Sequence, residues 1–479
     1  MNYEAVIGLE VHVQALTASK MFCACANRFG AEPNTLVCPV CLGYPGALPV
    51  MNAEAVKKTI EIGLMCGCAI ALRSKFDRKS YFYPDMPKNY QISQYDLPLC
   101  GLGHIAVGGK GFSGEPLPDK VIGITRIHLE EDVGKLNHFG RSSGVDYNRA
   151  GVPLMEVVSE PDMRSADEAY AYLTVLKQIC EYAGVSTCDM EKGQMRCDVN
   201  VSVRPVGETK LGTKIEIKNL NSFRSVHRSL LHEIERQTEA VRAGEKLRQE
   251  TRRWDDALGQ TFVMRVKEQA HDYRYFPEPD LMPVVLDEAQ VAAWRAALPE
   301  APEARRARFV ADFQVTPYDA HVLTLEKPLA DYFEAAAKAA GHPKLTANWI
   351  ITELLRELGE KNLTIDTCPI LPAAFGKLIA LVAGGAITGK SAKDVFAEMF
   401  ASGKAPEVIV QEKGLQQVND SGAILAFVDQ AIAASPKAVE EYRAGKTATI
   451  QFLVGQVMKL SRGKSNPQTV LALLKEKLG

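Results

Sequence analysis

The segment ITRIHLEED, at residues 124–132, carries polar side chains at alternate positions along most of its length. In a β-strand, alternate side chains point to the same face, so the polar and apolar residues of this segment would separate. The polar face would carry Arg126, His128, Glu130 and Asp132. Such a row offers ligands for a divalent cation and a guanidinium for phosphate. A strand with one face in solvent explains the same alternation, so this segment alone does not decide between the two.

Three further segments repeat this design of an apolar back and a polar front. They contribute Glu10 and His12 from GLEVHVQ, Arg196, Asp198 and Asn200 from MRCDVNVSVRP, and Lys214, Glu216 and Lys218 from TKIEIKNLN. An antiparallel sheet with its apolar face on helices would gather these side chains on one open surface. Carboxylate, amide and imidazole groups suit Mg²⁺ or Mn²⁺, and Arg and Lys suit phosphate oxygens. We therefore predict a surface that could bind a nucleotide without a glycine-rich loop.

Four of the eleven cysteines form two closely spaced pairs, Cys23 with Cys25 and Cys38 with Cys41. Such pairs near glycine and proline are typical of structural zinc sites in which four thiolates surround the ion. We predict a structural Zn²⁺ here, with all four positions filled by the chain and none left open for catalysis. Reduced, partly buried thiols are the alternative, and the remaining cysteines are interpreted as core or surface thiols.

The composition is that of an ordinary globular protein, with 46% hydrophobic and 24% charged residues. A formal net charge of −2 excludes a uniformly basic nucleic-acid-binding protein but allows a local basic patch. The first residues, MNYEAVIGLEVHV, lack the basic start of a signal peptide, and no apolar run is long enough to span a bilayer. We expect a cytoplasmic protein.

The length of 479 residues predicts about three domains. Residues 1–294 are rich in strands, glycine and proline, residues 295–403 have helical spacing, and residues 404–479 form a last helical segment. Between Lys437 and Lys477, eight Lys or Arg stand against three Asp or Glu. This excess favours contact with RNA, although a solvated surface explains it equally well. Helices are predicted at 53–65, 166–183, 222–243, 288–298, 302–312, 329–340, 345–358 and 372–381.

One motif points elsewhere, because Gly384–Ser391 reads GGAITGKS and matches the phosphate-binding loop G-x-x-x-x-G-K-[ST]. Such a loop needs a preceding strand and a parallel sheet continuing downstream, whereas the flanking segments here have helical patterns. We predict a glycine-rich turn between two helices. An NTPase centred on Lys390 stays open as a rival function, and so does a zinc-stabilised protein that binds tRNA without catalysis.

Several longer blocks resemble one protein family. They are YFYPDMPKNYQISQYDLPL (81–99), IGITRIHLEEDVGK (122–135), DYNRAGVPLMEVVSEPDM (146–163), MRCDVNVSVRP (195–205), EIKNLNSF (216–223) and MRVKEQAHDYRYFPEPDLMP (264–283). Together with GLEVH near the start and FLVGQVMK near the end, they cover essentially the whole chain in order. The chain resembles the GatB family, the B subunits of bacterial aspartyl/glutamyl-tRNA amidotransferases.

The resemblance implies an α+β fold: a catalytic domain similar to glutamine synthetase and guanido kinases with an antiparallel sheet, then an all-α domain and a small α-helical tail that binds tRNA. It implies a heterotrimer with an amidase subunit (GatA type), which releases ammonia from glutamine, and a small third subunit (GatC type). The B subunit would use ATP to phosphorylate the side-chain carboxylate of Glu-tRNA(Gln) or Asp-tRNA(Asn), and ammonia would displace the phosphate.

The resemblance also assigns residues. The Mg²⁺ ligands would be Glu10, His12, Glu130 and Glu156, followed by Glu131, Asp198 and Asn200. Contacts to ATP or the acyl phosphate would come from Arg196, Lys218, Arg265, Lys267 and Arg274. The ammonia route or the acceptor end would involve Lys88, Tyr90, Gln91 and Ser93. Structural salt bridges and a hydrogen-bonded loop are the alternatives. Of the adjacent glutamates, alternation favours Glu130, because Glu131 would face the apolar side unless the strand ends or bulges there.

Overall fold

The computed structural model describes residues 2–266, 273–416, 421–461 and 465–479. The chain forms two compact units, Met1–Ala301 and Pro302–Gly479. Each unit is described separately below.

The first unit is built on an eight-stranded sheet with the order β13-β12-β11-β10-β1-β9-β6-β5. Its strands are β1 (Tyr3–Gln14), β5 (Gly103–Lys110), β6 (Pro116–Glu131), β9 (Pro153–Ser159), β10 (Met195–Pro205), β11 (Ile215–Lys218), β12 (Glu250–Asp255) and β13 (Gln260–Val266). All four strands predicted from alternation therefore lie in one sheet. Neighbouring strands are antiparallel, except that β11 and β12 run parallel because helix α3 connects them. The fold is mixed α and β around a large sheet.

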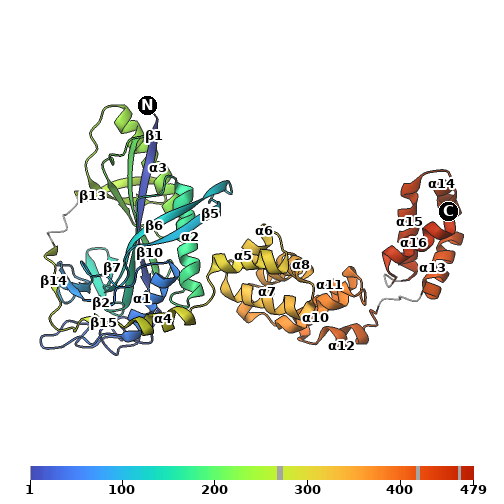
Figure 1. Cartoon of the computed structure of the whole chain (residues 1–479), viewed down its shortest axis with the longest axis horizontal. Helices are drawn as coiled ribbons and strands as arrows, with labels where there is room; N and C mark the ends of the chain where they lie inside the picture. The colour runs from blue at the N-terminus through green and yellow to red at the C-terminus, as the bar shows by residue number, and fades with distance from the viewer. Residues whose placement is uncertain (1, 267–272, 417–420, 462–464) are drawn as a thin grey trace. The chain divides into compact units, whose positions relative to one another are not determined.

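Helices cover one face of this sheet, as predicted (Figure 1). They are α1 (Ala53–Met65), α2 (Ala166–Tyr182) and α3 (Phe223–Arg242), each within one or two residues of the predicted ends. Asn52, Ser165 and Ser222 cap their first turns by accepting hydrogen bonds from backbone N–H groups. Apolar side chains from alternate strand positions pack against these helices in one core, so the opposite face of the strands carries the polar rows.

Strand β6 changes its phase near the middle. Ile122 and Ile124 lie in the core, and so do Ile127 and Leu129, although an uninterrupted alternation would place these pairs on opposite faces. The register with β9 shifts between Ile124 and Arg126, so Thr125 is the extra residue of a β-bulge. The bulge places His128 and Glu130 on the polar face.

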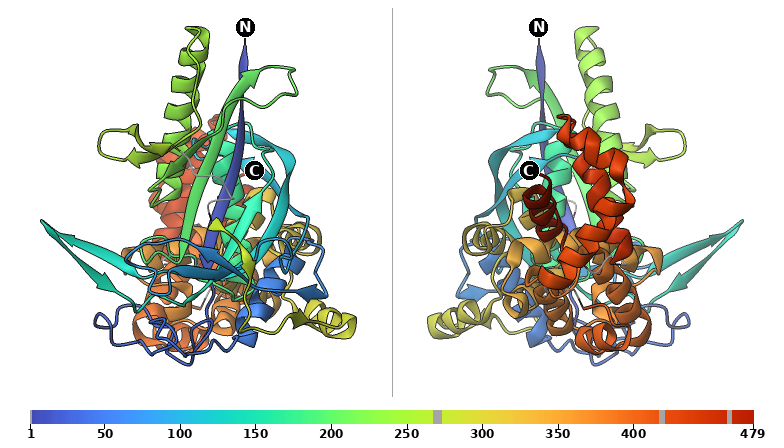
Figure 2. Two further views of the ribbon diagram at one scale, coloured as in Figure 1. Left: turned by 90° about the vertical axis from the view of Figure 1, so that its left-hand side faces the viewer. Right: turned by 90° about the vertical axis from the view of Figure 1, so that its right-hand side faces the viewer.

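Smaller elements surround the sheet. They are β2 (Arg73–Ser74) with β15 (Val284–Val285), β3 (Asp77–Ser80) with β4 (Tyr90–Ser93) and β14 (Phe276–Pro277), the hairpin of β7 (Lys135–Phe139) and β8 (Ser142–Asp146), and α4 (Glu288–Ala297). The β7–β8 hairpin projects from the body of the unit (Figure 2). Strand β4 contacts β6, so it brings the segment around Tyr90–Ser93 to the polar end of that strand.

In the part of the second unit that the structure describes, all regular elements are helical. They are α5 (Pro302–Phe313), α6 (Pro317–Leu323), α7 (Lys327–Ala340), α8 (Pro343–Trp349), the π-helical turn Ile350–Leu354, α9 (Leu355–Glu360), α10 (Pro372–Ala383), α11 (Gly389–Ser402), α12 (Pro406–Glu412), α13 (Ser421–Ala434), α14 (Pro436–Arg443), α15 (Ile450–Leu460) and α16 (Pro467–Leu478), with 3₁₀ turns at Ile365–Thr367 and Thr447–Thr449. One hydrophobic core joins α5 to α12 and another joins α13 to α16. The domain boundaries predicted at 294 and 403 stay predictions.

The GGAITGKS motif lies between two helices, as predicted. Its preceding apolar run is the end of α10, and Gly389 begins α11. The Thr388 side chain accepts a hydrogen bond from the Ser391 N–H, which is an ordinary helix cap. The strand that a phosphate-binding loop requires does not precede it.

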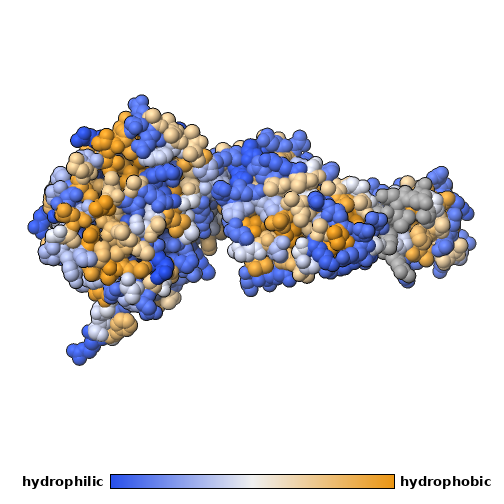
Figure 3. Space-filling view, turned by 90° about the horizontal axis from the view of Figure 1, so that it is seen from below, coloured by the Kyte–Doolittle hydropathy of each residue, from blue (hydrophilic) through white to orange (hydrophobic). Residues whose placement is uncertain are grey.

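Hydrophobic and hydrophilic residues are interspersed on the face shown in Figure 3. Among the described helices, none is both long enough and apolar enough to cross a membrane.

Candidate metal and phosphate site

The sheet brings together His12, Glu130 and Glu156 from three neighbouring strands. His12 on β1 and His128 on β6 both lie opposite Glu156 of the central strand β9. The His12 Nε2 atom is 3.3 Å from Glu156 Oε2 and 4.0 Å from Glu130 Oε1. One ligand atom from each of the three residues lies within 4.8 Å of the others. Adjacent ligands of an octahedral Mg²⁺ stand about 3 Å apart, so this group fits a small divalent cation.

His128 and Ser93 support this group from its buried side. His128 Nε2 lies 3.7 Å from Glu130 Oε2 and 3.6 Å from Glu156 Oε2. The Ser93 hydroxyl donates to Glu130 Oε2 at 2.9 Å. The ligands predicted from the sequence do not include His128, although its place in the alternating row is a signal for it. Ser93 was predicted to lie by the ammonia route or the acceptor end, and the structure places it on a candidate metal ligand.

Electrostatics keep both carboxylates ionised at neutral pH. Burial alone would raise the pKa of Glu156, but the charges of His128 and His12 lower it well below its ordinary value. Burial likewise opposes ionisation of Glu130, whose pKa is lowered by a hydrogen bond to His128 and the charge of Lys79. The same carboxylates raise the pKa of His12 despite its burial. The group therefore offers the anionic oxygens that Mg²⁺ prefers.

Glu10 and its neighbours extend the polar face along β1 and β10. Glu10 lies opposite Asp198, and its Oε1 accepts a hydrogen bond from Asn200 Nδ2 at 2.9 Å. The buried Asn200 Oδ1 has no hydrogen-bond partner among the described residues. An unpaired buried acceptor fits a bound cation or donor on this face, so Glu10 and Asn200 keep a possible ligand role beside the three-residue group.

The predicted cations differ in their surroundings. Arg196 Nη2 donates to Asp132 Oδ1 at 2.8 Å, and Lys218 forms an ion pair with Asp198. Both therefore have carboxylate partners, which is the structural role weighed from the sequence. Lys218 also lines an open hollow of about 660 Å³ beside Lys79 and Tyr81.

Arg274 lines the same hollow as Lys218 and is exposed. Arg265 is placed only by its backbone, which pairs with Thr251 at the edge of the sheet. Lys267 lies outside the described residues. The contribution of Lys79 was missed by sequence reasoning, because DRKS has no apolar alternation that marks an active-site strand.

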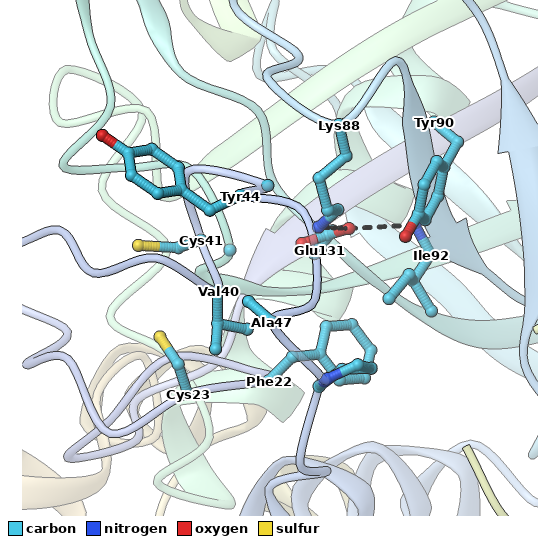
Figure 4. Close-up of a pocket in the computed structure, with 13 residues that line it drawn as sticks. Phe22, Cys23, Val40, Cys41, Tyr44, Ala47, Lys88, Tyr90, Ile92 and Glu131 are labelled. Carbon is cyan, nitrogen blue, oxygen red and sulfur yellow. Dashed lines mark hydrogen bonds and ion pairs between the residues drawn. The ribbon is translucent and has the colours of Figure 1, made fainter. Parts of the chain in front are cut away.

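Glu131 belongs to a second polar group at the end of β6. It forms an ion pair with Lys88 and accepts a hydrogen bond from the Ile92 N–H at 3.0 Å. Gln91 Nε2 donates to the Glu131 carbonyl oxygen at 2.7 Å. The side chains lie beside a hollow of about 80 Å³ that also reaches Cys23 (Figure 4). The predicted choice of Glu130 rather than Glu131 for the cation group agrees with this geometry.

The four predicted zinc ligands come together in the loop after β1. The sulfur atoms of Cys23, Cys25, Cys38 and Cys41 lie within 4.8 Å of one another. Four thiolates around Zn²⁺ have Zn–S bonds of about 2.3 Å and thus S–S distances of about 3.8 Å, so the cluster could hold a structural zinc. The Cys38 N–H donates to Cys41 Sγ at 3.1 Å.

The thiol of Cys41 is the most acidic of the group. A hydrogen bond from Cys23 lowers the pKa of Cys41 to about 4, while burial raises the pKa of Cys25 to about 11. The remaining cysteines are free thiols, most of them buried, as predicted.

Comparison with known proteins places the chain in a family. The family model of the GatB/GatE catalytic domain matches residues 5–292, and that of the GatB domain matches residues 331–478. The chain is similar to proteins named as the B subunit of aspartyl/glutamyl-tRNA(Asn/Gln) amidotransferase. The relative from Carboxydothermus hydrogenoformans is 55% identical over 100% of this chain and 99% of its own length. Those from Thermoanaerobacter pseudethanolicus and Geobacter sulfurreducens are 53% identical over 100% of both chains. The chain therefore belongs to the GatB family of amidotransferase B subunits.

Proposed function

We propose that this chain carries the kinase and amidation centre of a tRNA-dependent amidotransferase. It would transfer the γ-phosphoryl group of ATP to the side-chain carboxylate of Glu on tRNA(Gln), or Asp on tRNA(Asn). Ammonia would then displace the phosphate and form the amide. The enzyme would thus be an ATP-dependent carbon–nitrogen ligase with glutamine as the amido donor.

The chemistry explains why such a site needs both cations and ionised ligands. A carboxylate is a poor acyl donor because its leaving group would be oxide, and phosphorylation supplies a better one. The attacking carboxylate and the triphosphate are both anionic, so metal ions and Arg or Lys must offset their repulsion. The observation that carries the proposal is the convergence of His12, Glu130 and Glu156 on the open face of the sheet.

Each predicted residue receives a role in this proposal. His12, Glu130 and Glu156 would hold Mg²⁺ or Mn²⁺, with Glu10 and Asn200 next to them. The metal would polarise the phosphoryl oxygens when bound, and the cations would contact the phosphates. The cation set is Lys218 and Arg274 at the large hollow, with Arg196, Arg265 and Lys267, while Asp198 would hold Lys218 in place.

The wider assignments follow from family membership. The first unit would have the glutamine synthetase and guanido kinase type of fold, and residues 404–479 would form the tail that binds tRNA. The chain would work in the cytoplasm as a heterotrimer with the amidase subunit and the small third subunit. Ammonia from the amidase would pass by the hollow that Lys88 and Glu131 line, and the four cysteines would hold a structural Zn²⁺.

The test is an assay of the reconstituted three-subunit enzyme with Glu-tRNA(Gln) and Asp-tRNA(Asn). We expect ATP hydrolysis that depends on a misacylated tRNA and a matching amount of amide product. If tRNA binds but stimulates no ATP hydrolysis, the chain only binds tRNA and the proposed kinase role is wrong. Comparing both tRNAs identifies the substrate.

A further inference from the structure

Lys20 is a lysine with no exposed surface, a few residues after the first strand of the sheet. Its Nζ lies 3.6 Å from Cys41 Sγ and 3.3 Å from the Tyr147 carbonyl oxygen, and its backbone N–H donates to the Cys25 carbonyl at 2.9 Å. Among the residues that the structure describes, no carboxylate forms an ion pair with it. The group beside it that can carry a negative charge is therefore the Cys41 sulfur.

A buried ammonium is costly unless an opposite charge lies beside it. Four thiolates around Zn²⁺ carry a net charge of −2, and Lys20 would halve it. We propose that Lys20 is the counter-charge of the four-cysteine zinc site, and that its ammonium donates to the zinc-bound sulfur of Cys41. Groups that hydrogen-bond to metal ligands usually change metal affinity about 10- to 100-fold when they are removed.

The position of Lys20 also ties the zinc to the end of β6. The Met21 N–H donates to the Gly151 carbonyl at 2.7 Å, and the Gly151 N–H donates to the Asp132 carbonyl at 2.9 Å. Gly151 packs so closely that a side-chain carbon there would lie 3.6 Å from Lys20 Cδ and 3.9 Å from Glu131 Oε2. Loss of zinc would loosen Lys20 and, through Gly151, the segment that carries Asp132 and Glu131.

The experiment compares Lys20→Met, which keeps the length of the side chain but removes its charge, with two controls. Lys177→Met removes a lysine that is paired with Glu181 on the surface of α2. Leu230→Ala opens a cavity in the same core and lowers stability without touching the zinc site. Zinc transfer from the folded full-length chain to a coloured chelator is followed for each variant.

We expect Lys20→Met to release zinc about 10- to 100-fold faster than the wild type. Both controls should release it at the wild-type rate, even though Leu230→Ala melts at a lower temperature. Lys20→Gln, which keeps a donor without a charge, should give an intermediate rate and serves if Lys20→Met does not fold. Equal release by both Lys20 variants and the wild type, or a wild-type chain that retains no zinc, would overturn the proposal.

Cobalt(II) in place of zinc gives a second readout that does not depend on stability. The absorption band from sulfur-to-cobalt charge transfer reports how easily the thiolates give up an electron. Removing the nearby positive charge should shift this band to longer wavelength in Lys20→Met and leave it unchanged in Leu230→Ala. An unshifted band would show that Lys20 only fills space. Neither readout requires ATP or tRNA, so the result is independent of the proposed catalytic function.

Discussion

Glu130 and Glu131 are consecutive on β6, yet their carboxylates belong to two separate polar groups. Glu130 accepts from Ser93 and lies 4.0 Å from His12, in the cation group. Glu131 forms an ion pair with Lys88 beside the cysteine cluster. Because neighbouring side chains of a strand point to opposite faces, one dipeptide serves both groups. This arrangement allows the two groups to be tested one residue apart.

Replacing Glu130 with Gln should abolish tRNA-dependent ATP hydrolysis and amidation. The amide keeps the shape of the side chain but removes a negative charge from the cation group. We expect a loss of about a hundredfold or more, equivalent to roughly 2.7 kcal/mol of transition-state stabilisation. Rates are measured in the three-subunit enzyme, and the glutaminase activity of the partner should persist. Glu61→Gln on α1 is the control, and normal amidation by Glu130→Gln would rule out the metal role.

Glu131→Gln should act differently, because Glu131 lies outside the cation group. We expect tRNA-dependent ATP hydrolysis to continue while glutamine-dependent amidation falls, since the pair with Lys88 lies on the proposed ammonia route. The ratio of amide formed to ATP hydrolysed measures this uncoupling. A parallel loss of both activities would place Glu131 in the kinase site instead.

Lys390→Ala should leave ATP-dependent activity unchanged. Lys390 is an exposed residue in the first turn of α11, and the preceding turn is closed by a helix cap rather than by a phosphate cradle. Thr388→Ala, in contrast, should lower stability by about 1 kcal/mol through loss of the cap. Activity and thermal unfolding are measured for both variants. A loss of ATP hydrolysis in Lys390→Ala would revive the rival NTPase function.

The stability of the helical unit should depend on pH through Glu334. Hydrogen bonds from Arg308, Lys338 and Arg305 lower the pKa of Glu334 to about 2. An unfolded glutamate titrates near about 4.3, so the stabilisation is complete above that pH and is lost as the pH falls towards about 2. Glu334→Gln should therefore reduce the Tm at neutral pH, and the difference from wild type should shrink as the pH falls below about 4.3. Glu360→Gln, on the surface, should show no such dependence.

Removal of residues 421–479 should weaken binding of the charged tRNA much more than binding of ATP. Ile409 and Val410 of α12 belong to the core of the preceding helices, so a deletion that starts at 404 would damage that core. The helices from α13 onwards have a core of their own and can be removed without it. Binding is measured at several salt concentrations, because basic contacts weaken as salt rises. Equal loss of tRNA and ATP binding would contradict a tRNA-binding tail.

Features set by local alternation could be predicted from the sequence. The rows that contain His12, Glu130 and Asp198 followed from a two-residue period, and the three helices of the first unit followed from their spacing and caps. Glu156 was different. Strand β9 is buried on both faces, so PLMEVVS shows no alternation, and only the family resemblance identified its glutamate.

Long-range features could not be read in the same way. The strand order, which sets His12 and His128 opposite Glu156, depends on pairings between distant segments. The burial of Lys20 was unexpected, because lysine is seldom buried without a charged partner and its partner is a cysteine twenty-one residues away. The parallel pairing of β11 with β12 likewise depends on the helix that joins them.

The bulge at Thr125 makes the spacing along β6 as important as the residues themselves. Deleting Thr125 would restore an unbroken alternation with the first half of the strand. His128 and Glu130 would then turn towards the helices, while Ile127 and Leu129 would become exposed. Such a chain would still contain every ligand in the right order. A homologue that keeps the motif but lacks this one residue would therefore be expected to have lost the activity.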